Sequence, residues 1–181
     1  MVAALPVEIV PYDPAWPGRF ESEKAILVGI FRSVSVRVEH VGSTAVPGLG
    51  AKPVIDILLG VDVLTDVEAR IADLAAADYE YVQRYEAEFP ERRLFAKPRQ
   101  RPRAYHLHAV ERSTAFWRRQ LLFRNFLRCR SDVASDYCEL KRRLAADYGT
   151  DRDGYARAKT AFIEAVLERA DREFSHAKLH L

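Results

Sequence analysis

Cysteine is scarce in this chain, and long uninterrupted apolar runs are absent. The two cysteines, Cys129 and Cys138, are too few for a disulfide framework and lack the Cys-x-x-Cys spacing of a redox or zinc motif. Both fall in helical-looking sequence, so we expect reduced thiols packed in or near the core. The N-terminal MVAALPVEIV lacks the basic segment of an export signal, and no apolar stretch is long enough to span a bilayer. These absences predict a cytoplasmic protein with no membrane partner.

Charge is unevenly distributed along the sequence, although the net charge is only +2. Residues 84–130 hold 13 Lys and Arg against 4 Glu and no Asp, a local balance of +9 that leaves about −7 for the remainder. A basic segment in an otherwise acidic chain favours a local anionic ligand over a general nucleic-acid surface. A solvated basic face explains the same charges equally well.

Apolar periodicity predicts an α+β fold, in one domain over residues 1–181, since a chain with 49% apolar content can bury one core. Strands are expected at 7–12, 34–42, 53–61, 79–83, 92–97 and 103–110. Helices are expected from Asp13 to Arg32, from a Thr65–Glu68 capping box to Ala77, and in three stretches opening at Ser113, Ser131 and Asp151.

These elements predict a small mixed or antiparallel sheet, within about residues 7–110, packed against a C-terminal three-helix unit at about 113–174. No linker separates the two parts. The last residues, SHAKLHL, are expected to fray.

Asp56 is the only charge in the apolar run PVIDILLGV, which is typical of a central buried strand. An unpaired carboxylate there costs several kcal/mol, so Asp56 needs a bound cation or a basic partner. A buried salt bridge to Lys52 or to an arginine is the structural alternative. The preceding turn at Gly42, Ser43 and Thr44 can present N–H groups and hydroxyls to a phosphate, and Lys52 at its end joins these candidate nucleotide-binding residues.

His106 and His108 are two residues apart on a predicted strand, so both side chains project from one face. Imidazoles can bind Zn²⁺ or Mn²⁺, contact phosphate as cations or serve as a general base. Glu39 lies just before the glycine turn and adds a candidate metal carboxylate, although only one of Glu39 and His40 can share a face with Asp56. The alternative is that one histidine packs in the core and the other lies on the surface.

Basic and tyrosine side chains of the predicted C-terminal helices are further candidates for binding an anion. Arg124 and Arg128 are one helical turn apart and can clamp a polyanion through paired hydrogen bonds. Lys141, Tyr155 and Lys159 belong to two Tyr-x-x-x-Lys patterns and can reach a cleft between sheet and helices. Amphipathic helices also expose such residues routinely, which is the alternative.

A strand ending in Gly42-Ser43, a loop, and a strand carrying Asp56 together resemble the signature of the DNA polymerase β-like nucleotidyltransferases. The longer stretch EHVGSTAVPGLGAKPVIDILLGV resembles the GrpB family within that superfamily, and the similarity continues through YDPAW, YHLH at 105–108 and FRNFLR at 123–128. The resemblance implies a nucleotidyltransferase-type fold in which the Gly-Ser turn holds a nucleoside triphosphate. It also implies acidic residues that bind a divalent metal, Mg²⁺ or Mn²⁺, with Zn²⁺ as the alternative if histidines are ligands.

Leu58 departs from the superfamily pattern, because an active nucleotidyltransferase usually has a second acidic residue two positions after the first. Leucine cannot bind magnesium, so the metal site is either incomplete or rebuilt from residues such as His106 and His108. Two functions follow from this. One is transfer of a nucleotidyl group to a small acceptor with Asp56, His106 and His108 as catalytic residues, and the other is an inactive module that binds a nucleotide or another anion.

Two further functions are not favoured. Some GrpB domains are fused to dephospho-CoA kinase, but the sequence contains no G-x-x-x-x-G-K-[ST] loop, so kinase activity of that kind is not expected. A nucleic-acid partner is not expected either, because the chain has no zinc finger and no strand of interleaved aromatic and basic residues.

Overall fold

The computed structural model describes residues 6–100 and 102–178, with side chains as far as Phe174. The strands are β1 Arg37–Val41, β2 Ile55–Val61, β3 Glu80–Tyr81, β4 Arg92–Lys97 and β5 Tyr105–Glu111. The α-helices are α1 Trp16–Ile30, α2 Thr65–Glu68, α3 Ile71–Ala76, α4 Ala115–Cys129, α5 Ser131–Tyr148, α6 Arg152–Ala158 and α7 Thr160–Lys178. Two 3-10 turns are η1 Ser43–Ala45 and η2 Gln83–Tyr85. The α+β class predicted from the sequence is confirmed.

The five strands form one mixed sheet in the order β1-β2-β5-β4-β3. β2 pairs antiparallel with β1 and parallel with β5, and β4 pairs antiparallel with both β5 and β3. The parallel register places Asp56 of β2 beside His106 of β5. Because successive side chains of a strand alternate between faces, Asp56, His106 and His108 all project from the same face of the sheet.

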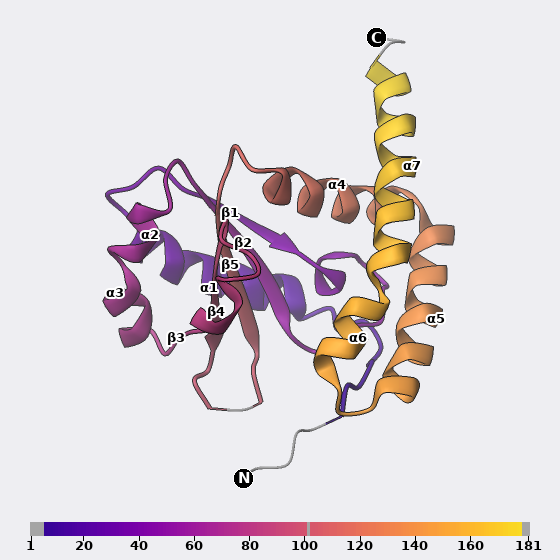
Figure 1. Cartoon of the computed structure of the whole chain (residues 1–181), viewed down its shortest axis with the longest axis horizontal. Coiled ribbons are helices and arrows are strands. Elements are labelled where there is room, and N and C mark those ends of the chain that lie inside the picture. Colours follow the sequence, from indigo (N-terminus) through magenta and orange to yellow (C-terminus); the bar gives the residue numbers. More distant parts are fainter. Residues whose placement is uncertain (1–5, 101, 179–181) are drawn as a thin grey trace.

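One face of the sheet is buried beneath α1, α2 and α3. Ile57, Leu59 and Leu107 are fully buried there in a cluster that includes Trp16 of α1. On the opposite face, part of the sheet is covered by α4, whose Trp117 packs against β2 and β5. Figure 1 shows α2 and α3 at one side of the molecule and α5, α6 and α7 grouped at the other, with the sheet between them.

The C-terminal helices build a second apolar cluster, in which α4 packs against α5 and α7. Val46 and Leu49, from the glycine-rich loop between β1 and β2, are buried in this cluster with Phe126, Leu127 and Tyr137. The loop is therefore held on both sides, by the sheet strands at its ends and by the helices around its middle. Among the described residues, no helix is both long enough and apolar enough to cross a membrane.

The N-terminal half differs from prediction in two places. Residues 7–12 do not form a strand, because only Val10 pairs, with Ala51, in an isolated bridge. Pro6, just before this stretch, and Pro11, within it, lack the N–H group that a longer ladder requires. The helix expected at 65–77 is broken into α2 and α3 around Arg70, and the predicted Thr65 cap is absent, since the helix begins after Leu64 without a side-chain cap.

The C-terminal half also differs in detail. Thr114, not Ser113, caps α4 by accepting a hydrogen bond from the Trp117 N–H. The third predicted helix is split at Lys159 into α6 and α7, although Asp151 caps its start as expected. Helix α7 continues to Lys178, so the frayed tail was predicted too early, and residues 179–181 lie outside the described part. Cys129 is exposed rather than packed in the core, whereas Cys138 is partly buried.

Candidate functional site

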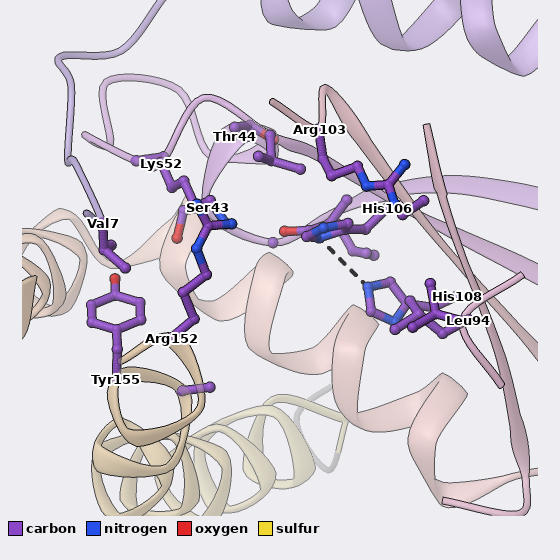
Figure 2. A pocket seen from close by; sticks show the side chains of 18 of the residues that line it. Val7, Ser43, Thr44, Lys52, Leu94, Arg103, His106, His108, Arg152 and Tyr155 are labelled. Atoms are coloured by element: carbon purple, nitrogen blue, oxygen red, sulfur yellow. Dashed lines mark hydrogen bonds and ion pairs between the residues drawn. The ribbon is translucent and has the colours of Figure 1, made fainter. Parts of the chain in front are cut away.

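A cleft of about 530 Å³ lies between the face of the sheet that carries Asp56 and the helices α5 and α6. Its walls come from the glycine-rich turn, from β2, β4 and β5, and from the segments around η2, α5 and α6 (Figure 2). Ten residues predicted from the sequence line it: Gly42, Ser43, Thr44, Lys52, Asp56, His106, His108, Lys141, Tyr155 and Lys159. A cavity of this size is in the usual range for a small-molecule site.

Asp56, His106 and His108 form a compact group of potential metal ligands. The Asp56 Oδ1 lies 3.2 Å from His106 Nδ1 and 3.7 Å from His108 Nε2, and one donor atom from each residue lies within 4.8 Å of the others. Two ligands of a tetrahedral ion with bonds of about 2.0–2.1 Å are separated by roughly 3.3 Å, so these spacings suit a bound metal. Among the described residues, Asp56, His106 and His108 are the His, Cys, Asp or Glu side chains that lie close enough together to hold a metal ion.

The protonation of this group also suits a metal. Burial opposes ionisation of Asp56, but hydrogen bonds and charge from His106 and His108 outweigh it and hold the pKa of the carboxyl well below its ordinary value. Burial lowers the pKa of His108, which keeps that imidazole neutral at physiological pH. An ionised carboxylate and a neutral imidazole are the forms that bind metals. The Nδ1 atom of His108 is buried and has no hydrogen-bond partner among the described residues.

Gly42 is required beside this group for a geometric reason. Its φ of +71° and ψ of −171° belong to a region that other residues rarely adopt. A Cβ atom at this position would lie 2.4 Å from Asp56 Oδ2. The turn can therefore approach the carboxylate only because the residue has no side chain.

Leu58 occupies the position where a second metal-binding carboxylate was expected. It lies two residues after Asp56 on the same face, is fully buried, and packs with Val41, Val110 and Trp117. Helix α4 covers this part of the sheet, so the cleft ends before Leu58. The acidic component of the centre is Asp56 alone, and the imidazoles lie where further ligands are needed.

The Gly-Ser turn continues as η1, and its residues are fixed from behind. Thr44 is buried, and its hydroxyl lies 2.9 Å from His40 Nε2. The His40 ring is stacked on Phe20 of α1. Burial is the main reason that the pKa of His40 falls to about 4. The charge of Asp56 raises this pKa, whereas the charges of Arg128 and Arg124 lower it. A neutral His40 therefore ties the turn to the α1 side of the sheet.

Lys141, Tyr155 and Lys159 face the cleft from the helical side. Lys141 is buried and its Nζ donates a hydrogen bond to the Gly50 carbonyl. The Lys159 Nζ lies 4.3 Å from the centre of the Tyr155 ring. Figure 2 shows Tyr155 at the opposite end of the cleft from His108. All three side chains lie at the cleft, as one of the two predictions placed them, and not on an open helix surface, as the other did.

Three predicted residues lie elsewhere. The Glu39 carboxylate accepts a hydrogen bond of 2.8 Å from Arg124 Nη1, which also donates to the His40 carbonyl. Arg128 donates through Nε to the Ala45 carbonyl at 2.9 Å. None of the three lines the cleft. Glu39 and Arg124 neutralise each other, and the two arginines hold backbone carbonyls, Arg124 that of His40 in β1 and Arg128 that of Ala45 in η1. The structure therefore does not bring Glu39 to the metal group or the two arginines to the anion cleft.

Sequence reasoning missed three arginines that line the cleft, namely Arg84, Arg103 and Arg152. Arg84 and Arg103 belong to the basic segment 84–130, so the charge asymmetry contained a signal for them. Arg152 begins α6 and reaches into the cleft (Figure 2), but nothing in its local sequence distinguishes it from a surface arginine. With Lys52, Lys141 and Lys159, the cleft has six basic side chains against the carboxylates of Asp56, Glu80 and Asp153.

A basic cleft with one carboxylate and two imidazoles at one end, set on a five-stranded mixed sheet, defines an α+β protein with a candidate metal and anion site. The sequence matches the family described as "GrpB protein" over residues 6–169, and the chain belongs to that family. The resemblance to the GrpB family deduced from the motifs is thereby confirmed.

Relatives agree with this assignment. The chain is 39% identical to a UPF0157 protein of Pseudomonas aeruginosa, over 91% of this chain and 67% of that protein. The crystal structure of conserved protein GrpB from Enterococcus faecalis is similar with a TM-score of 0.82 and 34% identity, covering 92% of this chain and 99% of that one. A dephospho-CoA kinase of Mycolicibacterium paratuberculosis is 30% identical over 93% of this chain, which spans 47% of the kinase.

Proposed function

We propose that the cleft binds a divalent metal through Asp56, His106 and His108 and a nucleoside triphosphate beside it, and that the protein transfers the nucleotidyl group to a small acceptor. The observation that carries the proposal is the convergence of one ionised carboxylate and two imidazoles on a single point in a basic cleft. A metal at that point would stabilise negative charge on a phosphate group.

The donor set favours particular metals. Two imidazoles and one carboxylate suit Mn²⁺ or Zn²⁺ better than Mg²⁺, which prefers oxygen ligands and retains its waters. Three protein ligands leave coordination positions open for the ligand, as in catalytic rather than structural metal sites. We therefore expect Mn²⁺ or Zn²⁺ to bind more tightly than Mg²⁺.

The phosphates are proposed to lie against the turn. Gly42 allows the backbone to pass close to Asp56, and the Ser43 hydroxyl and Lys52 line the same cleft. Six basic side chains around three carboxylates give this space a positive balance, which favours a polyanion. The nucleoside would extend toward Arg84 and Arg103, where the cleft continues along β4.

The buried Leu58 supports a second candidate. A centre with one carboxylate cannot hold two metal ions in the way of a two-metal nucleotidyltransferase, so the same cleft is also consistent with a module that binds a nucleotide without turnover. Binding and turnover therefore have to be measured separately.

Calorimetric titration with Mn²⁺, Zn²⁺ and Mg²⁺, followed by ATP, CTP, GTP and UTP in the presence of each metal, tests the proposal. We expect one transition-metal site per chain and nucleotide binding that is tighter with the metal than without it. Asp56→Ala and His106→Ala should lose the metal site and, with it, this increase in nucleotide affinity. Asp62→Asn is the control, because this exposed carboxylate lies just beyond the other end of β2 and pairs with Arg112.

Pyrophosphate release from nucleoside triphosphates, in the presence of candidate hydroxyl and amine acceptors, separates the two functions. Turnover that disappears in Asp56→Ala supports the transferase, and metal-dependent binding without turnover supports the module. The absence of nucleotide binding with all three metals would rule out both.

A further inference from the structure

Two lysines in the helical wall of the cleft have no acidic partner. Lys141 is 2% exposed, and its Nζ contacts the Gly50 carbonyl and the face of the Tyr137 ring, 4.8 Å from its centre. The Lys159 Nζ lies over the ring of Tyr155. Within the described part of the chain, no carboxylate forms an ion pair with either lysine.

An unpaired buried ammonium group is costly, because it loses its hydration and gains no opposite charge in return. Aromatic faces and one carbonyl offset only part of that cost. Both lysines line the cleft, so a bound anion can supply the missing charge. The site is therefore better suited to its liganded state than to its free state.

The charges that face Lys141 come from several elements. Cys138 and Arg142 lie on its own helix α5, Lys159 faces it from the junction of α6 and α7, and Asp56 faces it across the cleft from β2. Burial is the main cause that lowers the pKa of Lys141 to about 7, and the charges of Lys159 and Arg142 add to the effect. Burial also lowers the pKa of Lys159, with a contribution from Lys52.

We propose that Lys141 and Lys159 form a subsite for the terminal phosphates of a di- or triphosphate chain, and that Lys141 takes up a proton when the phosphates bind. This inference rests on the proposed function, because it assigns the terminal phosphates of the proposed ligand to the helical wall of the same cleft. The metal group lies on the sheet wall and the lysines on the helical wall, so several linked phosphates can engage both, whereas a single phosphate engages one.

The direction of the pH effect follows from the free state of Lys141. Below pH 7 the free amine is already protonated, so ligand binding requires no proton. Above pH 7 the free amine is largely neutral, whereas the phosphate-bound amine is charged, so each binding event takes up a proton. Affinity should therefore fall as the pH rises through and above 7.

The test uses inorganic tripolyphosphate as the probe, without nucleoside and without metal. Calorimetric titrations at pH 8 in Tris and in HEPES, whose ionisation enthalpies differ, count the protons exchanged on binding. Titrating Lys141→Met in parallel cancels protons that belong to the ligand. We expect the wild type to take up close to one proton more than Lys141→Met, and each of Lys141→Met and Lys159→Met to bind at least tenfold more weakly.

Three controls make the test decisive. Lys141→Arg keeps the charge but does not titrate, so it should bind tripolyphosphate without the extra proton. Lys24→Met changes a surface lysine of α1, paired with Glu21, and should bind like the wild type. Orthophosphate should bind more weakly than tripolyphosphate to the wild type.

Asp56→Ala should still bind tripolyphosphate with proton uptake, which separates this inference from the metal-dependent proposed function. Equal proton uptake in the wild type and Lys141→Met would overturn the proton coupling. Unchanged affinity of Lys159→Met for tripolyphosphate would overturn the subsite. This outcome can be measured even if Lys141→Met fails to fold.

Discussion

At the scale of single residues, the candidate site depends on the contact between Gly42 and Asp56. The missing side chain of Gly42 leaves just enough room for the Asp56 carboxylate, which in turn lies within 3.2 Å of His106. A methyl group at this position would displace the carboxylate rather than a flexible side-chain end, because Asp56 is short and belongs to a central strand. The turn and the metal group are therefore coupled through one van der Waals contact.

Gly42→Ala should consequently damage both stability and metal binding. The backbone conformation and the clash with Asp56 together should cost about 2–4 kcal/mol of unfolding free energy. Metal affinity should fall at least tenfold because the carboxylate is displaced. Urea denaturation and a Mn²⁺ or Zn²⁺ titration measure the two effects.

Gly48→Ala is the matched control for this prediction. Gly48 also has a positive φ, of +78°, but nothing lies within 4 Å of the position of its Cβ. It should lose about 1 kcal/mol of stability from backbone strain and keep its metal affinity. Equal metal affinity in both variants would show that the Gly42 contact does not position Asp56.

The sequence allowed some of these residues to be predicted and not others. Asp56 is conspicuous as a charge in an apolar strand, and the spacing of His106 and His108 places both on one face, so local patterns were sufficient. The contact between Asp56 and His106 depends on the parallel pairing of β2 with β5, which are about 50 residues apart and carry no local signal for each other. Arg152 was missed for the same reason, since only the packing of α6 brings it to the cleft.

At the scale of elements, the loop between β1 and β2 is held by side chains from two helices. Arg128 of α4 donates to the Ala45 carbonyl and Lys141 of α5 to the Gly50 carbonyl, both within the loop, while Arg124 of α4 donates to the carbonyl of His40 near the end of β1. These long side chains replace the backbone hydrogen bonds that a loop lacks. The two arginines predicted to bind an anion therefore have a structural role here. The prediction was wrong because the local sequence does not show whether an arginine will meet a backbone carbonyl or a phosphate.

Arg128→Met should loosen this loop without unfolding the protein. The hydrogen bond from a charged donor to a carbonyl contributes about 1–2 kcal/mol, and methionine retains most of the packing of the stem. Hydrogen exchange measured by mass spectrometry should become faster in peptides that cover residues 42–50 and remain unchanged in β4. Arg119→Met, which removes an exposed ion pair with Glu164, serves as the control and should leave the loop unchanged.

Element boundaries show which physical signals were reliable. The bounds of β4 were predicted correctly, with a Pro-containing loop following its end, and Gly149 ends α5 as expected. The strand at 7–12 was wrong because periodicity describes side chains, whereas pairing also needs a neighbouring strand and free N–H groups. The break at Lys159 was missed because the sequence around it is helical on both sides.

At the scale of the whole molecule, the apolar clusters connect the sheet to the helices. Leu49 of the β1–β2 loop packs among residues of the C-terminal helices, and Trp117 of α4 packs against Leu58 of the sheet. Gly60 permits this second contact, since a Cβ there would lie 2.5 Å from the Trp117 ring. The sheet and the C-terminal helices thus share apolar clusters, although the cleft lies between them.

We therefore predict that the chain unfolds as one cooperative unit. In a Trp117→Phe background, Trp16 fluorescence follows the α1 face of the sheet, and far-ultraviolet circular dichroism follows mainly the C-terminal helices. The two urea transitions should coincide, because the shared clusters make separate unfolding expose apolar surface on both parts. Leu49→Ala in this background should lower both midpoints together, by about 2–4 kcal/mol in unfolding free energy, since Leu49 is 3% exposed.

Val63→Ala controls for the effect of truncation itself, because Val63 is 47% exposed and should change neither midpoint appreciably. Two separated transitions, or a Leu49→Ala shift confined to the circular dichroism, would mean that the sheet and the helices fold independently. In that case a ligand that contacts both walls of the cleft would have to bring them together on binding. Its apparent affinity would then be proportional to the fraction of free molecules in which the two walls already lie together. Coincident transitions instead mean that the sheet, which carries the metal group, and the helices, which carry the two lysines, fold together before any ligand binds.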